Sequence, residues 1–153
     1  MSLLDDVSIV VTPNGYKAGE LYAVIPVPTE GADLVDNGDF ATDTDWTKSA
    51  GWTISGGTAN CDGTGGGSIY QDISGVENTR YAITLTISGY TSGTLQIGGS
   101  TNNLEVDEDG TFTHYRTWTS DSILYLKSKS GDGFNGSISN VSVKEYTSAD
   151  MDV

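Results

Sequence analysis

The sequence predicts an all-β protein, an antiparallel β-sandwich preceded by an extended N-terminal arm. Composition is the first reason: of the 153 residues, 36 are Ser or Thr and 20 are Gly, whereas 9 are Leu and 8 are Ala. Such a composition favours short strands and turns over helices. Turn signals recur about every 8 to 14 residues, a spacing typical of sandwiches and barrels. No segment shows a helical period, so the apolar faces of the strands must pack between two sheets.

Proline usage divides the chain into an arm, a sandwich and a tail. All three prolines lie before residue 35, at positions 13, 26 and 28, and the following region has none. We therefore interpret residues 1–34 as the N-terminal arm, residues 35–147 as the sandwich and residues 148–153 as a short C-terminal tail.

The arm has too few large apolar residues to build a core of its own. Pro26 and Pro28 favour extended backbone and remove hydrogen-bond donors from any sheet ladder. We expect the arm to contact other chains by adding a strand to a neighbouring sheet edge, the alternative being an edge strand on its own sandwich. The residues expected to make these contacts are Val7, Ile9, Val11, Tyr16, Leu21, Tyr22 and Ile25.

Eight strands are expected in the sandwich, and residues 80–88 give the clearest signal. Apolar residues alternate there with small or polar ones, the period of two that marks a half-buried strand. The eight expected strands, in chain order, are residues 52–54, 58–61, 68–73, 80–88, 94–97, 111–119, 123–128 and 137–146.

One face of the strand at residues 80–88 is the expected centre of the core. The apolar positions of two later strands are expected to face it or to lie beside it. Trp46 and Trp52 are expected to belong to the core or to plug loops beside it. The main predicted core residues are Tyr81, Ile83, Leu85, Ile87, Leu124, Leu126, Val141 and Val143.

Three connections between strands carry distinct signals. Ser55-Gly56-Gly57 predicts a hairpin turn, and the glycine-rich residues 62–67 predict a flexible connection. Residues 107–110 predict a second hairpin turn. The acidic spacing that starts at Glu105 resembles a helix-flanked calcium loop, but position 12 is Arg116 instead of the bidentate Glu that such a loop requires.

Charge excludes two classes of partner. With 21 acidic and 7 basic residues the formal net charge is −14, which disfavours nucleic acid and anionic membranes. No apolar run approaches the roughly 20 residues that span a bilayer. The first residues, MSLLDDVSIVV, are acidic where a secretion signal is basic. We therefore expect the chain to fold in a cytoplasm.

Residues that carry chemistry are scarce, and we expect no enzymatic activity. The single cysteine, Cys61, allows no internal disulfide and is expected to be a small buried apolar residue. The single histidine, His114, excludes a His-rich metal site and lies within an expected strand. The chain has no G-x-S-x-G elbow and no phosphate-binding loop.

Several motifs resemble a known family. Asn37-Gly38-Asp39-Phe40, Trp46 and Gly51-Trp52-Thr53-Ile54 are similar to the opening of the jelly-roll domains of carbohydrate-binding-module families 4 and 9. Tyr70-Gln71 and the ending Ile138-Ser139-Asn140-Val141-Ser142-Val143 fit the same pattern, so the resemblance covers residues 35–146. It implies that the sandwich is a jelly roll.

The same resemblance implies a structural calcium ion between the opening loop and the last strand. The expected ligands are Asp36, Asp39 and Asn140, although these modules commonly carry a carboxylate where this chain has Asn140. A solvated acidic loop, which also includes Asp43 and Asp45, is the alternative. No other cofactor is expected.

A glycan platform is the second expectation that the resemblance brings. Along the strand at residues 111–119, Phe112, His114, Arg116 and Trp118 share one face. If that face points outward, Trp118, Arg116 and His114 would bind a sugar, with Tyr125 as an accessory contact. Alternatively, Phe112 and Trp118 belong to the core and Arg116 is paired at the sheet edge.

The arm adds a second resemblance, which gives the leading functional hypothesis. Residues 6–22 are similar to the amino-terminal segments of many tailed-bacteriophage virion proteins. This resemblance implies a non-enzymatic virion protein, made in the host cytoplasm, that acts as a head decoration (cement) protein or a short fibre component. Its partners would be capsid or tail proteins, and it could be a homo-oligomer such as a trimer. The alternative is a carbohydrate-binding module that recognises a glycan of the host surface.

Overall fold

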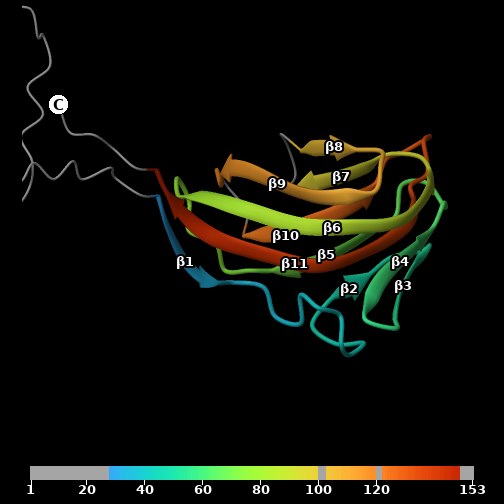
Figure 1. Cartoon of the computed structure of the whole chain (residues 1–153), viewed down its shortest axis with the longest axis horizontal. Helices are drawn as coiled ribbons and strands as arrows, with labels where there is room; N and C mark the ends of the chain where they lie inside the picture. The colour runs from blue at the N-terminus through green and yellow to red at the C-terminus, as the bar shows by residue number, and fades with distance from the viewer. Residues whose placement is uncertain (1–27, 100–102, 120–121, 149–153) are drawn as a thin grey trace, which may run out of the picture. The chain divides into compact units, whose positions relative to one another are not determined.

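The computed structural model describes residues 28–99, 103–119 and 122–148, and these residues form two antiparallel β-sheets (Figure 1). All eleven elements of this part of the chain are strands, which confirms the all-β sandwich predicted from composition and turn spacing. Within the described ranges, no helix has the length and apolar character needed to cross a membrane.

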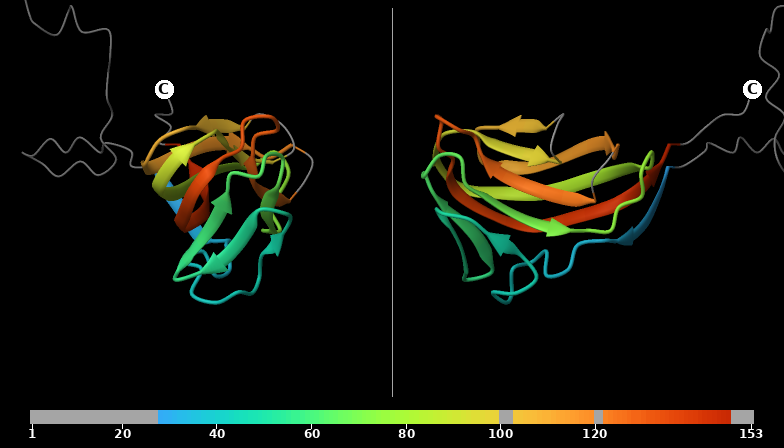
Figure 2. Two further views of the ribbon diagram at one scale, coloured as in Figure 1. Left: turned by 90° about the vertical axis from the view of Figure 1, so that its right-hand side faces the viewer. Right: turned by 180° about the vertical axis from the view of Figure 1, so that it is seen from behind.

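The first sheet has six strands. Its order is β3-β4-β11-β6-β9, with β1 also paired to β11. The two longest strands, β6 and β11, lie next to each other and curve together along the sandwich (Figures 1 and 2). The six strands are β1 (Thr29–Asp33), β3 (Trp52–Ser55), β4 (Thr58–Asp62), β6 (Arg80–Ser92), β9 (Gly110–Thr117) and β11 (Asn135–Thr147).

The second sheet has five strands in the order β2-β5-β10-β7-β8. Its strands are short, and its inner residues alternate with outer ones along β5 and β10. The five strands are β2 (Thr47–Lys48), β5 (Ser68–Asp72), β7 (Leu95–Gly98), β8 (Leu104–Val106) and β10 (Ile123–Ser128).

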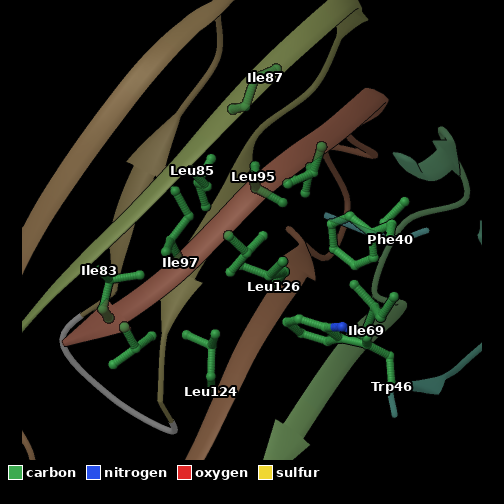
Figure 3. Packing of buried hydrophobic residues seen from close by; sticks show 14 of the residues in the cluster. Phe40, Trp46, Ile69, Ile83, Leu85, Ile87, Leu95, Ile97, Leu124 and Leu126 are labelled. Atoms are coloured by element: carbon green, nitrogen blue, oxygen red, sulfur yellow. The ribbon is translucent and has the colours of Figure 1, made fainter. Parts of the chain in front are cut away.

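The core lies between the two sheets, as the alternation predicted (Figure 3). Strand β6 contributes its odd-numbered residues 81 to 87, all of them buried, and β10 contributes Leu124 and Leu126 from the facing sheet. Val141 and Val143 of β11, Trp46 and Trp52 are also buried, as expected. Cys61 is a free, buried cysteine, and burial raises the pKa of its thiol.

The predicted hairpin at Ser55 is confirmed. Strands β3 and β4 pair so that Ser55 faces Thr58, which leaves Gly56 and Gly57 as a two-residue loop. Their φ angles of 66° and 77° are the left-handed values that a type I′ turn requires at both central positions. Glycine adopts such angles without the steric cost that a Cβ brings.

The predicted hairpin at residues 107–110 is wrong. The residues before this turn form β8 in the five-stranded sheet, and those after it form β9 in the six-stranded sheet. The turn therefore carries the chain from one sheet to the other instead of joining two paired strands. A local turn signal shows that the chain reverses, but it does not show which strand will be the partner.

Strand β1 lies in the segment that the proline pattern placed in the arm. It pairs with β11, and the Leu34 amide donates to the carbonyl of Val143 at 2.9 Å. The Asp33 side chain accepts from the Val143 amide at 3.0 Å. The compact unit spans Glu30–Thr147. The arm contacts predicted for Val7, Ile9, Val11, Tyr16, Leu21, Tyr22 and Ile25 lie outside the described residues.

Candidate functional site

The glycan platform expected on β9 is not formed, because its central residues point inward. The side chain of Trp118, just beyond the end of β9, is 1 % exposed, and Arg116 is 8 % exposed. The Trp118 ring packs edge-on against Tyr81, with ring centroids 5.7 Å apart. The guanidinium of Arg116 lies over the same indole, 4.6 Å from its centroid. These two residues are therefore buried, which agrees with the alternative interpretation for Trp118, whereas that interpretation placed Arg116 in a pair at the sheet edge.

Strand alternation also places His114 on the inner side of the six-stranded sheet. It pairs with Ile83, a core residue of β6, and its side chain is half-buried. The neighbours Thr113 and Tyr115 are exposed and take the outer face. Of the four predicted sugar contacts, His114, Arg116 and Trp118 thus share the inner face, and Tyr125 lies in the other sheet.

Tyr125 lies on the outer face of the five-stranded sheet beside a second tyrosine, Tyr70. Strands β5 and β10 pair so that these two residues are directly opposite each other. Their ring centroids are 5.2 Å apart and the ring planes meet at 36°. Both tyrosines face outward, because their neighbours along the strands point into the core, and both side chains are half-buried. Two adjacent aromatic rings therefore lie on the solvent side of this sheet.

The two tyrosines belong to a row of residues that crosses the sheet. Thr47 of β2 pairs with Tyr70, and Gly98 of β7 pairs with Tyr125. Thr47 is small and exposed at one end of the row. Gly98, at the other end, has no side chain but is buried, because the Asn103 side chain and the Arg116 guanidinium lie where its Cβ would be. We call Thr47, Tyr70, Tyr125 and Gly98 the aromatic row.

A second row, parallel to the first, consists of polar side chains. Its four residues are paired with one another across the neighbouring strands β5, β10, β7 and β8. On β5, β10 and β7 each lies two residues from the member of the aromatic row on the same strand. Because residues two apart on a strand share a face, both rows lie on the outer face of the five-stranded sheet. We call this set the polar row: Ser68, Lys127, Gln96 and Glu105.

Glu105 is the electrostatic centre of the polar row. Its carboxylate accepts a hydrogen bond from Lys129 Nζ at 2.8 Å and another from Gln96 Nε2 at 2.8 Å. The hydrogen bond from Lys129, and then the one from Gln96, hold the pKa of Glu105 below its usual value. The same contact raises the pKa of Lys129. Glu105 and Lys129 therefore form an ion pair at this end of the row.

Lys127 connects the two rows. Its ammonium lies 4.2 Å from the centroid of the Tyr125 ring and donates to the carbonyl of Gly99 at 3.3 Å. A cation over an aromatic face is attracted by the ring quadrupole. The face thus combines aromatic surface, one charged donor and an ordered amide–carboxylate pair within adjacent rows.

Sequence reasoning selected Tyr125 but missed Tyr70 as its partner. Tyr70 alternates with the buried residues Ile69 and Gln71, so the sequence marks it as an outward-facing strand residue. The pairing of β5 with β10 makes the two tyrosines neighbours, and nothing near either residue in the sequence reveals that pairing.

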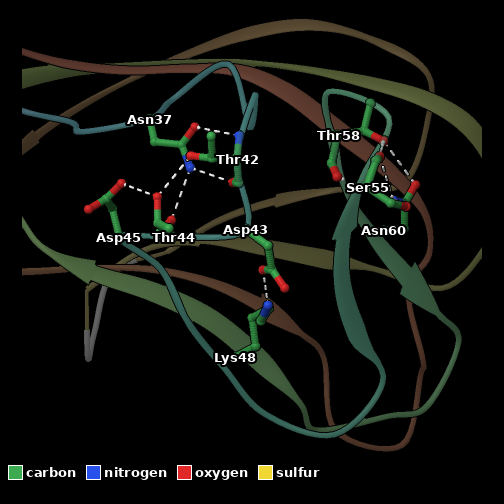
Figure 4. Close-up of polar contacts among 9 residues, drawn as sticks. All are labelled: Asn37, Thr42, Asp43, Thr44, Asp45, Lys48, Ser55, Thr58 and Asn60. Carbon is green, nitrogen blue, oxygen red and sulfur yellow. Dashed lines mark hydrogen bonds and ion pairs between the residues drawn. The ribbon is translucent and has the colours of Figure 1, made fainter.

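Within the opening loop, residues 36–46, the Asn37 side chain contacts the backbone of two threonines (Figure 4). Its amide nitrogen donates to the carbonyls of Thr42 and Thr44 at 2.7 and 2.9 Å. Lys48 forms an ion pair with Asp43 below the loop. The Asn37 amide thus holds the carbonyls of Thr42 and Thr44 on the inside of the loop.

The residues expected to bind calcium lie around the junction between this loop and β11. The Val141 amide donates to the carbonyl of Gly38 at 2.9 Å, which brings the loop against the strand next to Asn140. A Cβ at Gly38 would lie 2.0 Å from the Val141 carbonyl oxygen, so only glycine fits this close approach. Within the described ranges, no three His, Cys, Asp or Glu side chains are grouped to bind a metal. Calcium binding by Asp36, Asp39 and Asn140 therefore stays a prediction.

Comparison with solved structures finds a similar β-sandwich. The chain is similar to the mannan binding module from Man5C, with a TM-score of 0.52 and 16 % identity over 68 % of this chain and 94 % of that one. The same module in its bound conformation gives a TM-score of 0.50 at 16 % identity, over 66 % and 91 % of the two chains. The chain thus shares the β-sandwich fold of this carbohydrate-binding module.

No protein-family profile matches the chain, and no curated protein matches its sequence. The likeness to the two solved structures lies in the fold, since the identity is 16 % in both.

Proposed function

We propose that this chain is a non-catalytic module that binds a neutral glycan on the outer face of its five-stranded sheet. The observation that carries the proposal is the pair of adjacent rings, Tyr70 and Tyr125, with the polar row beside them. The similarity of the fold to a mannan binding module supports the same function and makes mannan the first ligand to test.

The two rows suit the two kinds of surface that a sugar presents. The C–H face of a pyranose ring is apolar and packs on an aromatic ring, whereas its hydroxyls need hydrogen-bond partners. Tyr70 and Tyr125 supply the aromatic surface. Lys127 and Gln96 supply donors, and Glu105 supplies acceptor oxygens, on the strands that carry or flank the rings.

The electrostatics of the face favour binding over hydrolysis. A glycosidase needs a carboxylic acid whose pKa is raised, so that it can protonate the leaving oxygen. The carboxyl of the polar row, Glu105, instead has a lowered pKa because Lys129 and Gln96 donate to it. Glu105 is therefore suited to accept hydrogen bonds from a ligand but not to act as a general acid.

The test is the affinity of the full chain for soluble neutral polysaccharides, mannan first, measured by affinity electrophoresis and calorimetry. Tyr125→Ala and Tyr70→Ala should each weaken binding about tenfold or more, equivalent to about 1.4 kcal/mol, as expected for an aromatic anchor. Val76→Ala is the matched control, because Val76 is an exposed apolar side chain outside both rows. Equal affinity of the tyrosine variants and the wild type would refute the proposed face.

A virion location remains a separate prediction, as do the decoration or fibre role and the capsid, tail or homo-oligomeric partners. The residues on which that prediction depends, 6–22, lie outside the described part of the chain. A glycan-binding sandwich is compatible with such a role, since a virion protein can present it to a host surface.

A further inference from the structure

A second aromatic cluster lies on the outer face of the six-stranded sheet, away from the aromatic and polar rows. The guanidinium of Arg80 in β6 is 5.6 Å from the ring centroid of Tyr115 in β9 and 5.6 Å from that of Tyr146 in β11. The two ring centroids are 4.7 Å apart. A planar cation is therefore held against two aromatic rings from the two flanking strands.

Sheet register explains why these three side chains converge. Ala82 pairs with Tyr115 of β9 on one side and with Lys144 of β11 on the other. Arg80 lies two residues before Ala82 and Tyr146 lies two residues after Lys144, so both share the outer face with Tyr115. Ala82 is 5 % exposed although it lies on an outer face, which means that longer neighbouring side chains cover it. Tyr115, at 45 % exposed, remains open to solvent.

The charge of Arg80 is not neutralised by a carboxylate within the described part of the chain. The three ion pairs found there all use lysines, namely Lys48, Lys129 and Lys144. Arg80 is exposed and its described contacts are the two aromatic rings. Since Arg80 is exposed, the N–H donors of its guanidinium are accessible to a ligand.

We propose that Arg80, Tyr115 and Tyr146 form a second binding site, specific for a sugar residue that carries a carboxylate, that is, a uronic acid. A guanidinium binds a carboxylate through two parallel hydrogen bonds, and the rings beside it offer apolar surface to the pyranose. This site goes beyond the proposed neutral-glycan face, because it lies on the other sheet and binds a charged group of the sugar.

The net charge of the chain restricts which acidic glycans can bind at this site. At −14 the protein repels a polymer that carries a charge on every residue. The site therefore suits a glycan in which isolated uronic acid residues alternate with, or branch from, neutral sugars. One guanidinium in the cluster can neutralise one carboxylate at a time.

The experiment uses a neutral xylooligosaccharide and the same oligosaccharide carrying one glucuronic acid branch, each titrated by calorimetry into the full chain. The wild type should bind the branched sugar at least tenfold more tightly. Arg80→Ala should abolish that preference, and Arg80→Lys should keep a few-fold part of it because a lysine retains the charge without the bidentate geometry. Tyr146→Ala should weaken the binding of the acidic sugar.

Lys48→Ala is the charge-matched control, since it removes one positive charge from a residue paired with Asp43 outside the cluster. It should leave the preference unchanged, and the melting temperature of each variant verifies its fold. A wild type without preference for the acidic sugar, or an Arg80→Ala variant that keeps it, would overturn the proposal. The outcome is independent of the neutral-glycan face: failure of Tyr125→Ala to affect mannan binding would refute that face and leave the Arg80 site standing.

Discussion

At the scale of single residues, the outer face of the five-stranded sheet is organised by Glu105. This carboxylate is exposed, yet two side chains from different segments donate to it, Gln96 from the neighbouring strand and Lys129 from beyond β10. An exposed ion pair contributes little to stability by itself. The contacts of Glu105 instead position the amide of Gln96 and the ammonium of Lys129 at the end of the polar row.

The titration of Glu105 tests this arrangement. Glu105 should titrate below its ordinary pKa, because Lys129 and Gln96 donate to its ionised form. The favourable interaction is therefore complete above the unfolded-state pKa and is lost as the pH falls through the lower folded-state value. Lys129→Ala should raise the pKa of Glu105 toward the ordinary value, measured from the side-chain carboxyl carbon by NMR.

Lys48→Ala serves as the control for that titration, because Lys48 pairs with Asp43 and not with Glu105. An unchanged pKa of Glu105 in Lys129→Ala would mean that the ion pair does not persist in solution.

At the scale of elements, the opening loop is fastened to β5 by a buried glutamine. Gln71 Oε1 accepts from the Asp36 amide at 2.9 Å, and its Nε2 donates to the carbonyls of Asp36 and Asp45, each at 2.9 Å. One side chain thus satisfies backbone groups at both ends of the loop. Since buried polar groups must be hydrogen-bonded, the loop and the strand depend on each other.

Replacing Gln71 should therefore destabilise the fold. Gln71→Leu keeps much of the side-chain volume but leaves the backbone groups of Asp36 and Asp45 without their partner, at a cost of about 1 to 3 kcal/mol. Urea denaturation measures the loss, and faster hydrogen exchange of the Asp36 amide would localise it. Gln96→Leu, on the outer face of the sheet, should stay within about 0.5 kcal/mol of the wild type. An equal loss in both variants would contradict the role assigned to Gln71.

At the scale of the whole molecule, the sandwich is completed by a strand from the segment before it. Strand β1 pairs with β11 beyond the stretch where β4 does, and Leu34 and Val35 pack against the core. The Leu34 amide donates to the Val143 carbonyl, and the Asp33 side chain accepts from the Val143 amide. The unit that should fold cooperatively therefore includes β1, and it starts near residue 29 and not at residue 35.

Two truncations separate these boundaries. A chain that starts at residue 29 keeps β1 and should melt cooperatively near the temperature of the full protein. A chain that starts at residue 35 loses β1 and should melt at least about 2 °C lower, since each lost hydrogen bond contributes about 0.5 to 1.5 kcal/mol. Calorimetry of both chains decides the matter, and identical melting temperatures would show that β1 does not stabilise the sandwich.

The sequence by itself determined the fold class and most of the core. Alternation in β6 is local, so Leu85 and its neighbours can be assigned to one face without knowing any partner strand. The Gly56–Gly57 turn is equally predictable, because a type I′ turn requires positive φ at two adjacent positions and glycine adopts positive φ readily. The scarcity of cysteine, histidine and basic residues likewise limits the possible chemistry, and it depends on composition alone.

Only the tertiary structure decided which residues form the candidate sites. Strand β9 has aromatic residues on both faces, and period two cannot tell whether Trp118 or Tyr115 points outward until β9 is placed against the core. Tyr70 and Tyr125 are neighbours only because β5 pairs with β10. The Arg80 cluster forms only because β6 pairs with β9 on one side and with β11 on the other. Contacts between residues distant in sequence are set by packing of the whole chain, and a short stretch of sequence does not contain that information.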